Sequence, residues 1–154
     1  MKRALVLLVF VFAIASAVLG LASSRTASAN DASAPGDERF TAYDVWIDSG
    51  AAPLAAWQVE IAATDGRARL VGVEGGDPGA FAAPPYYDPK ALASGERIVL
   101  AAFDTGSALP SGRARVARIH VLVEGPVEPR LSARIVAAAD SEGRALEARV
   151  EVRP

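Results

Sequence analysis

Residues 110–124, which read PSGRARVARIHVLVE, decide the fold class of this chain. The Pro-Ser-Gly triplet predicts a turn, and the residues after it alternate between two faces. The apolar face comprises Ala117, Ile119, Val121 and Val123, and the mixed face comprises Val116, Arg118, His120, Leu122 and Glu124. This period of two predicts a long β-strand with one face in a core and the other partly in water.

Further stretches along the chain have the alternation and composition of strands. They are residues 40–47, 54–62, 67–73, 97–103, 131–138 and 145–152. Asp65-Gly66 and residues 140–143 each predict a hairpin between the strands that flank them. One short helical turn is expected at residues 89–93, and no helix of ordinary length. Short strands with frequent turns predict an all-β fold, an antiparallel β-sandwich of the jelly-roll or immunoglobulin-like kind, over residues 39–154.

One long segment, residues 74–94, interrupts the succession of strands. It is rich in glycine and proline, which excludes a long regular element. Its expected anchors are the aromatic residues Phe81, Tyr86 and Tyr87. Tyr86 and Tyr87 are also a candidate carbohydrate-binding pair, because binding residues often lie on loops and an open aromatic ring can stack on a sugar. Trp46 and Trp57 lie beside apolar neighbours in their strands and are expected in the core.

The N-terminus has the pattern of a secretory signal. Lys2 and Arg3 precede residues 4–22, which carry no charge, and an Ala-Ser-Ala cleavage pattern follows at residues 27–29. Residues 1–29 are therefore expected to be a cleaved signal peptide. The alternative is an uncleaved anchor, because this uncharged, mostly apolar run of 19 residues is also long enough to span a membrane. Both readings place the rest of the chain outside the cytoplasm, after a disordered lead-in at residues 30–38.

The composition excludes several classes of function. The 154 residues include no cysteine and one histidine, so thiol catalysis, disulfides and cysteine or histidine-rich metal sites are excluded. The formal net charge is −2, and the chain without residues 1–29 has 13 basic and 18 acidic residues, a net charge of −5. Such a domain is a poor nucleic-acid binder, because that function relies on neutralising phosphates. We expect no cofactor.

Basic residues on the predicted strands are the candidate protein-binding group. If they lie on one exposed sheet face, they could bind an acidic partner through bidentate contacts. The candidates are Arg67, Arg69, Arg97, Arg118 and His120. The alternative is an ordinary solvated face on which acids such as Glu60 and Glu124 are interspersed.

Catalytic and metal sites are weakly supported by the sequence. His120 is the single histidine and has no predicted nucleophile or acid near it, so a structural role is favoured. Five acidic residues could in principle bind calcium: Asp44, Asp48, Asp77, Asp88 and Asp104. They lack the spacing of a calcium loop. The sequence therefore predicts a protein that is not an enzyme.

Four stretches resemble strands and turns of the cohesin-type domains, within the superfamily of carbohydrate-binding β-sandwiches. They are AWQVE at residues 56–60, LVGVEG at residues 70–75, LPSG followed by VARIHV at residues 109–121, and ADSEG at residues 139–143. The resemblance covers about residues 40–153. It implies a non-catalytic module that docks a dockerin-like protein partner through an exposed sheet face. Relatives in the superfamily bind polysaccharide, which is the alternative, and a purely structural envelope domain is the third hypothesis.

Overall fold

The computed structural model describes residues 38–65 and 67–154. The predicted signal peptide, its cleavage pattern, the possible anchor at residues 4–22 and most of the lead-in lie outside the described residues. Residue 38, expected in the lead-in, already belongs to the first strand. The elements are β1 (Glu38–Asp48), β2 (Ala56–Asp65), β3 (Arg67–Gly75), α1 (Pro89–Ser94), β4 (Arg97–Phe103), β5 (Arg113–Glu124), β6 (Arg130–Ala139) and β7 (Arg149–Arg153). No helix among these residues is long and apolar enough to cross a membrane.

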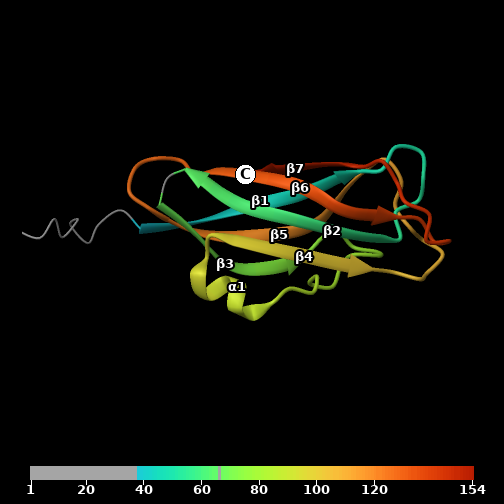
Figure 1. The fold of residues 1–154 in the computed structure, drawn as a ribbon, viewed down its shortest axis with the longest axis horizontal. Coiled ribbons are helices and arrows are strands. Elements are labelled where there is room, and N and C mark those ends of the chain that lie inside the picture. Colours follow the sequence, from blue (N-terminus) through green and yellow to red (C-terminus); the bar gives the residue numbers. More distant parts are fainter. Residues whose placement is uncertain (1–37, 66) are drawn as a thin grey trace, which may run out of the picture. The chain divides into compact units, whose positions relative to one another are not determined.

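The strands form two antiparallel sheets that pack face to face as a β-sandwich (Figure 1). Sheet A has the strand order β3-β5-β1-β7, and sheet B has the order β4-β2-β6. The prediction of an all-β sandwich is therefore confirmed. The strand ranges also agree closely, except that β7 is confined to Arg149–Arg153 where residues 145–152 were expected.

The core lies between the two sheets, and β5 supplies a row of its residues. Ala117, Ile119, Val121 and Val123 are all completely buried, as the alternation in residues 110–124 predicts. Other fully buried core residues come from four further strands and the loop before β2: Val45, Ile47, Leu54, Val59, Ile61, Leu70, Ile98 and Leu100. Burying such side chains is worth about 1.5–3 kcal/mol each before the entropy of ordering is subtracted, so this core is the main stabilising feature.

Two residues of the mixed face of β5 are also buried, which the alternation did not predict. The register between β1 and β5 shifts so that Val45 faces Ala117 and Trp46 faces Arg115. Val116 is the extra residue of this bulge and is completely buried. A bulge redirects the side chains on one side of it, so Arg115 joins the outer face. Leu122, which is 7% exposed, lies in register between Phe40 and Arg69 on the neighbouring strands.

Both hairpin predictions need correction. β2 pairs with β4 and β6, whereas β3 pairs with β5, so the connection around Asp65 crosses from sheet B to sheet A. The connection after β6 starts as a hairpin, with a bridge between Ala139 and Ala145. It then crosses as well, because β7 pairs with β1. Turn residues predict that the chain reverses, but not whether the next strand stays in the same sheet.

The long segment between β3 and β4 packs along the outer edge of β4. It contains the expected helical turn as α1, whose first N–H groups are capped by the Asp88 side chain, 2.9 Å from the Lys90 nitrogen. Phe81 is buried and meets Trp57 edge to face, with ring centroids 6.0 Å apart. Tyr86 forms an isolated antiparallel bridge with Ala101 of β4. This bridge brings a loop residue onto the outer face of sheet B.

Candidate binding surfaces on the two sheets

The outer face of sheet A carries arginines that are paired with acids of the same face. Arg118 donates from Nε and Nη2 to the two carboxylate oxygens of Asp44, at 2.8 and 3.3 Å. Arg115 donates from Nη1 to Asp44 at 3.2 Å and from Nε to Asp77 at 2.9 Å. These side chains come from β1, β5 and the loop after β3, so the ion pairs link three segments of the chain.

The Arg118 and Arg115 guanidinium groups hold Asp44 as a carboxylate. Its pKa is lowered chiefly by the hydrogen bond from Arg118, against the opposing effect of its desolvation. In return, the hydrogen bond to Asp44 raises the pKa of Arg118. A partner carboxylate would have to displace Asp44 from Arg118, so this arginine is a weak candidate for binding an acidic ligand.

The other predicted basic residues of this face differ in whether their side chains are free to bind a partner. His120 Nε2 lies 2.9 Å from Glu74 Oε1, which is an exposed contact that suits a structural role. Arg69 on β3 is exposed and makes no ion pair within the described residues. Arg67 begins β3, and its side chain lies outside what the structure describes. The binding role of these residues stays a prediction.

Trp46 lies on the outer face of sheet A and is not a core residue, so the prediction for this tryptophan is wrong. It is half-buried beneath Arg113, whose guanidinium carbon is 4.7 Å from the ring centroid. The alternation of β1 gives the reason, since Val45 and Ile47 on either side of it point into the core. Trp57 is 2% exposed, as predicted for the core, although its indole nitrogen has no hydrogen-bond partner.

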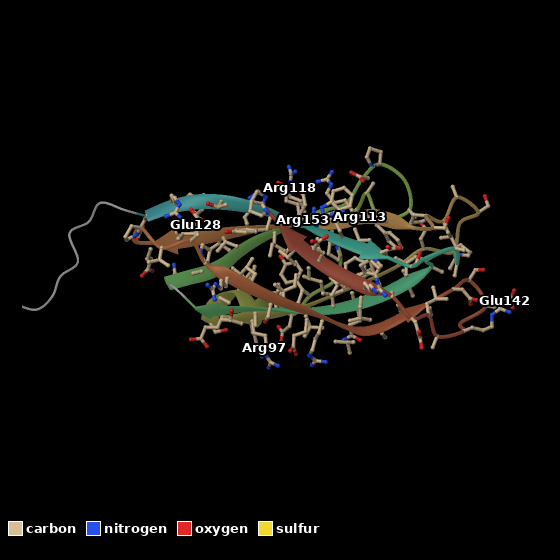
Figure 2. All side chains as sticks on the ribbon, turned by 90° about the horizontal axis from the view of Figure 1, so that it is seen from above. Arg97, Arg113, Arg118, Glu128, Glu142 and Arg153 are labelled. Carbon is tan, nitrogen blue, oxygen red and sulfur yellow. The ribbon has the colours of Figure 1, made fainter. Side chains whose placement is uncertain are left out.

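Arg97 does not share a face with the other predicted basic residues. It lies on β4 in sheet B, whereas Arg118 and His120 lie on β5 in sheet A. Figure 2 shows Arg118 and Arg97 extending from opposite sides of the sandwich. The hypothesis that all five residues gather on one sheet face is therefore wrong, because alternation within a strand does not specify its sheet.

On sheet B, Arg97 belongs to a second ion-paired group. Glu60 accepts from Arg134 Nε and Nη2 at 3.0 Å each and from Arg97 Nη1 at 3.0 Å. The hydrogen bond from Arg134 is the main cause that lowers the pKa of Glu60. Two arginines share one carboxylate here, and their side chains are 65% and 63% exposed. This group therefore has an excess positive charge that water now solvates.

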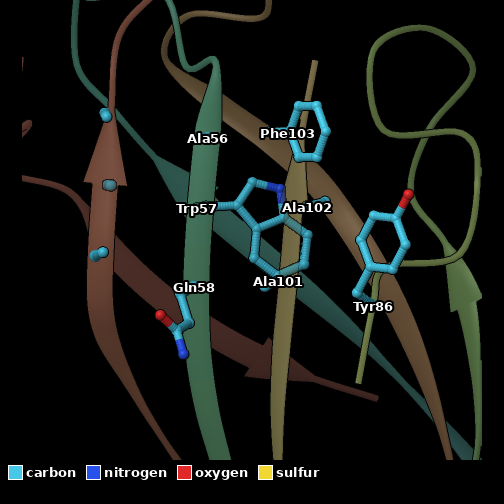
Figure 3. A pocket seen from close by; sticks show the side chains of 10 residues that line it. Ala56, Trp57, Gln58, Tyr86, Ala101, Ala102 and Phe103 are labelled. Atoms are coloured by element: carbon cyan, nitrogen blue, oxygen red, sulfur yellow. The ribbon is translucent and has the colours of Figure 1, made fainter. Parts of the chain in front are cut away.

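Beyond these arginines, the same outer face of sheet B is hollowed into an apolar groove (Figure 3). Its volume is about 250 Å³. Small side chains make its floor, and aromatic rings stand at one side. The lining residues are Ala56, Trp57, Gln58, Tyr86, Ala101, Ala102, Phe103, Ala137, Ala138 and Ala139. Gln58 and the hydroxyl of Tyr86 are the polar side-chain groups of this lining.

Two exposed aromatic rings border the groove. Tyr86 is 71% exposed and Phe103 is 66% exposed, and their rings are nearly parallel with centroids 6.4 Å apart. Tyr87 is half-buried and packs against the core, so the structure separates the predicted tyrosine pair. Phe103 was not predicted as a site residue from the sequence, although its place two residues after Ala101 in an alternating strand puts the two on one face.

The five acidic residues that could in principle bind calcium have other roles, and they do not come together. Asp48, Asp88 and Asp104 each accept a backbone N–H two residues further along the chain. Asp44 and Asp77 are bound by arginines, as described above. In the described part of the chain, no three acidic or histidine side chains are grouped so as to hold a metal ion.

We found no family model, no curated protein and no solved structure that matches this chain. The resemblance to cohesin-type domains therefore stays a prediction.

Proposed function

We propose that this chain is a non-catalytic, extracytoplasmic binding domain that docks a protein partner on the outer face of sheet B. The observation that supports this most strongly is the apolar groove beside the exposed rings of Tyr86 and Phe103. Exposed apolar surface is costly in water, and where it is contiguous on a folded domain it marks an interaction site.

The partner that fits this face is a protein segment with an apolar side chain next to an acidic one. The alanine floor offers contact area but no hydrogen bonds, which suits the aliphatic or aromatic anchor of a protein interface. The neighbouring Arg97 and Arg134 share only Glu60, so a partner carboxylate would complete their neutralisation. Of the basic residues predicted from the sequence, Arg97 is thus the one placed on the docking face.

A second candidate ligand is polysaccharide. The observation that favours it is the pair of exposed, nearly parallel rings of Tyr86 and Phe103, which could stack on sugar rings. The alanine floor argues against it, because of the lining side chains only Gln58 and the Tyr86 hydroxyl could replace the hydrogen bonds that sugar hydroxyls would lose to water.

Selection from a random peptide display library tests the proposal. We expect peptides that combine an apolar residue with a nearby Asp or Glu, and we expect Phe103→Ser to weaken their binding roughly 30-fold, as for a hot-spot residue. Val127→Ser is the matched control, since Val127 is 60% exposed on a loop outside the groove. Selected peptides that bind both variants equally would contradict the docking site.

Affinity electrophoresis in gels with cellulose, xylan or pectin separates the second candidate from the first. Retardation that Phe103→Ser and Tyr86→Ser both abolish would support sugar binding and contradict the protein-docking proposal. Unchanged mobility in every gel would remove the polysaccharide candidate.

A further inference from the structure

We propose that two copies of this chain associate through the free edge of β1, forming an antiparallel strand pair across a two-fold axis. The proposal goes beyond the docking function and uses none of the residues of the groove on sheet B. It depends on an unpaired stretch of β1, residues 38–42, and on Phe40, whose side chain is 74% exposed in the middle of that stretch.

β1 has a second neighbour along only half of its length. It pairs with β5 throughout, but β7 pairs only with residues 44–48 (Figure 1). Pro154 follows β7 and has no backbone N–H to donate to a neighbouring strand. Among the described residues, no strand lies against residues 38–42 on that side. Their alternate N–H and C=O groups therefore face outward and can pair with another strand.

The other sheet edges carry features that hinder pairing. The register of β3 shifts around Val71, and the register of β6 shifts around Val136, so both strands are bulged. Beside β4, the bridge between Tyr86 and Ala101 occupies the outer edge. Bulges and covering segments are common ways to block edge-to-edge association. β7, the remaining edge strand, is short and carries Arg149, Glu151 and Arg153, which also hinder pairing. Residues 38–42 have a regular register and no cover from the described residues, so they are the edge best suited to a second copy.

A hollow of about 460 Å³ lies beneath this edge, between the two sheets. Thr41 and Tyr43 of β1 line it on one side, and Leu131 of β6 lines it on the other. A strand added beside residues 38–42 would cover the mouth of the hollow. The stretch of β1 with no neighbouring strand among the described residues therefore lies over a hollow between the sheets.

Symmetry and charge select one register for the pair. A two-fold axis perpendicular to the sheet must pass midway between a residue and its own copy, so that this residue faces itself across the strand pair. The reason is that directly opposite residues point to the same face of the sheet. An axis at Arg39 would place two like charges opposite each other. An axis at Thr41 would place Glu38 opposite Asp44 of the second copy, a position that Arg153 already occupies. Both registers are unfavourable.

An axis at Phe40 meets neither obstacle. It places the two Phe40 rings opposite each other on the outer face, where an aromatic cross-strand pair is favourable. It also places Arg39 opposite Thr41, and Glu38 opposite Ala42, so no like charges face each other. Sheet A of one copy would then continue into sheet A of the other.

Single cysteines in this cysteine-free chain test the register directly. Directly opposite residues have Cβ atoms about 5 Å apart, near the reach of a disulfide. We expect the full chain with Phe40→Cys, kept in mild detergent because residues 4–22 are apolar, to form a covalent dimer on gentle oxidation. Thr41→Cys and the loop variant Val127→Cys are the controls and should cross-link much less. Equal cross-linking of the three variants would overturn the proposal.

Sedimentation of the full chain over a dilution series gives the second test. The wild type should show a reversible monomer–dimer equilibrium, weak because the paired edge is short. Phe40→Lys should shift it to monomer, since two ammonium groups would face each other, while Val127→Lys should leave it unchanged. The variants should stay folded because both side chains are exposed. A wild type that stays monomeric, or a dimer that Phe40→Lys leaves intact, would contradict the proposal.

Discussion

The outer faces of the two sheets both carry arginines that share a carboxylate, but they differ in what surrounds that group. On sheet A, Arg118 and Arg115 surround Asp44, and Arg115 also reaches a second acid, Asp77. On sheet B, Arg97 and Arg134 share Glu60, and the rest of the face is an alanine-floored groove with exposed rings. The cluster around Asp44 matches two arginines with two acids and serves stability, whereas the Glu60 group leaves one arginine charge unmatched beside apolar surface that a partner could use.

The largest expected effect on stability follows from removing Asp44. Asp44→Ala leaves Arg118 and Arg115 without their shared carboxylate, and we expect the free energy of unfolding to fall by about 1–2 kcal/mol. Glu151→Ala is the control on the same face, because Glu151 pairs with exposed arginines and should cost about 0.5 kcal/mol or less. Urea denaturation measures both, and equal losses would contradict a special role for Asp44.

Acidification is the next test of the face of sheet A. The Arg118 hydrogen bond lowers the pKa of Asp44, and the Arg144 hydrogen bond lowers the pKa of Asp140 in the turn after β6. A group whose folded pKa is lowered contributes stability above its unfolded pKa, about 3.9, and loses that contribution as the pH falls through the folded pKa. We therefore expect stability to decline below about pH 4.

The variant Asp44→Asn should reduce that acid dependence, because one of the responsible carboxylates is then absent. Urea denaturation between neutral and acid pH measures the slope of stability against pH for each protein. If the wild type and Asp44→Asn had the same slope of stability against pH, the arginine pairs of sheet A would not stabilise the fold.

The smallest expected effect concerns Glu60 on sheet B. Glu60→Gln releases Arg97 and Arg134 from their shared acid, so acidic peptides selected on the groove should bind more tightly, by about threefold. Glu147→Gln removes the same charge at an exposed position away from this group and serves as the control. Titration of the peptide against each variant measures the change, and weaker binding to Glu60→Gln would contradict the assignment of the two arginines.

The sequence predicts the faces of the strands well because side-chain direction alternates within each strand. Ala117 and Ile119 are buried for this reason. Val116 was missed, since the bulge that buries it depends on how β5 pairs with β1. Trp46 was placed in the core because of its apolar character, although the alternation of its own strand puts it on the outer face.

The binding surfaces were harder to predict because they depend on contacts between distant segments. Arg97 has the same local pattern as Arg118, but strand pairing puts them in different sheets. Likewise, Tyr86 reaches Phe103 only because a loop residue bridges to β4. Composition and alternation contain no signal for these pairings, so the groove could be found only from the fold.

The most direct test of the account compares one arginine introduced on each sheet, each in an edge strand beside a bulge. Ala137→Arg on β6 fills the groove, and Val71→Arg on β3 lies on the other sheet, with Val71 already 37% exposed. We predict that Ala137→Arg no longer binds the peptides selected on the wild type, whereas Val71→Arg binds them with unchanged affinity. Both variants should keep the stability of the wild type. Loss of binding in Val71→Arg with retention in Ala137→Arg would contradict the assignment of the docking surface to sheet B.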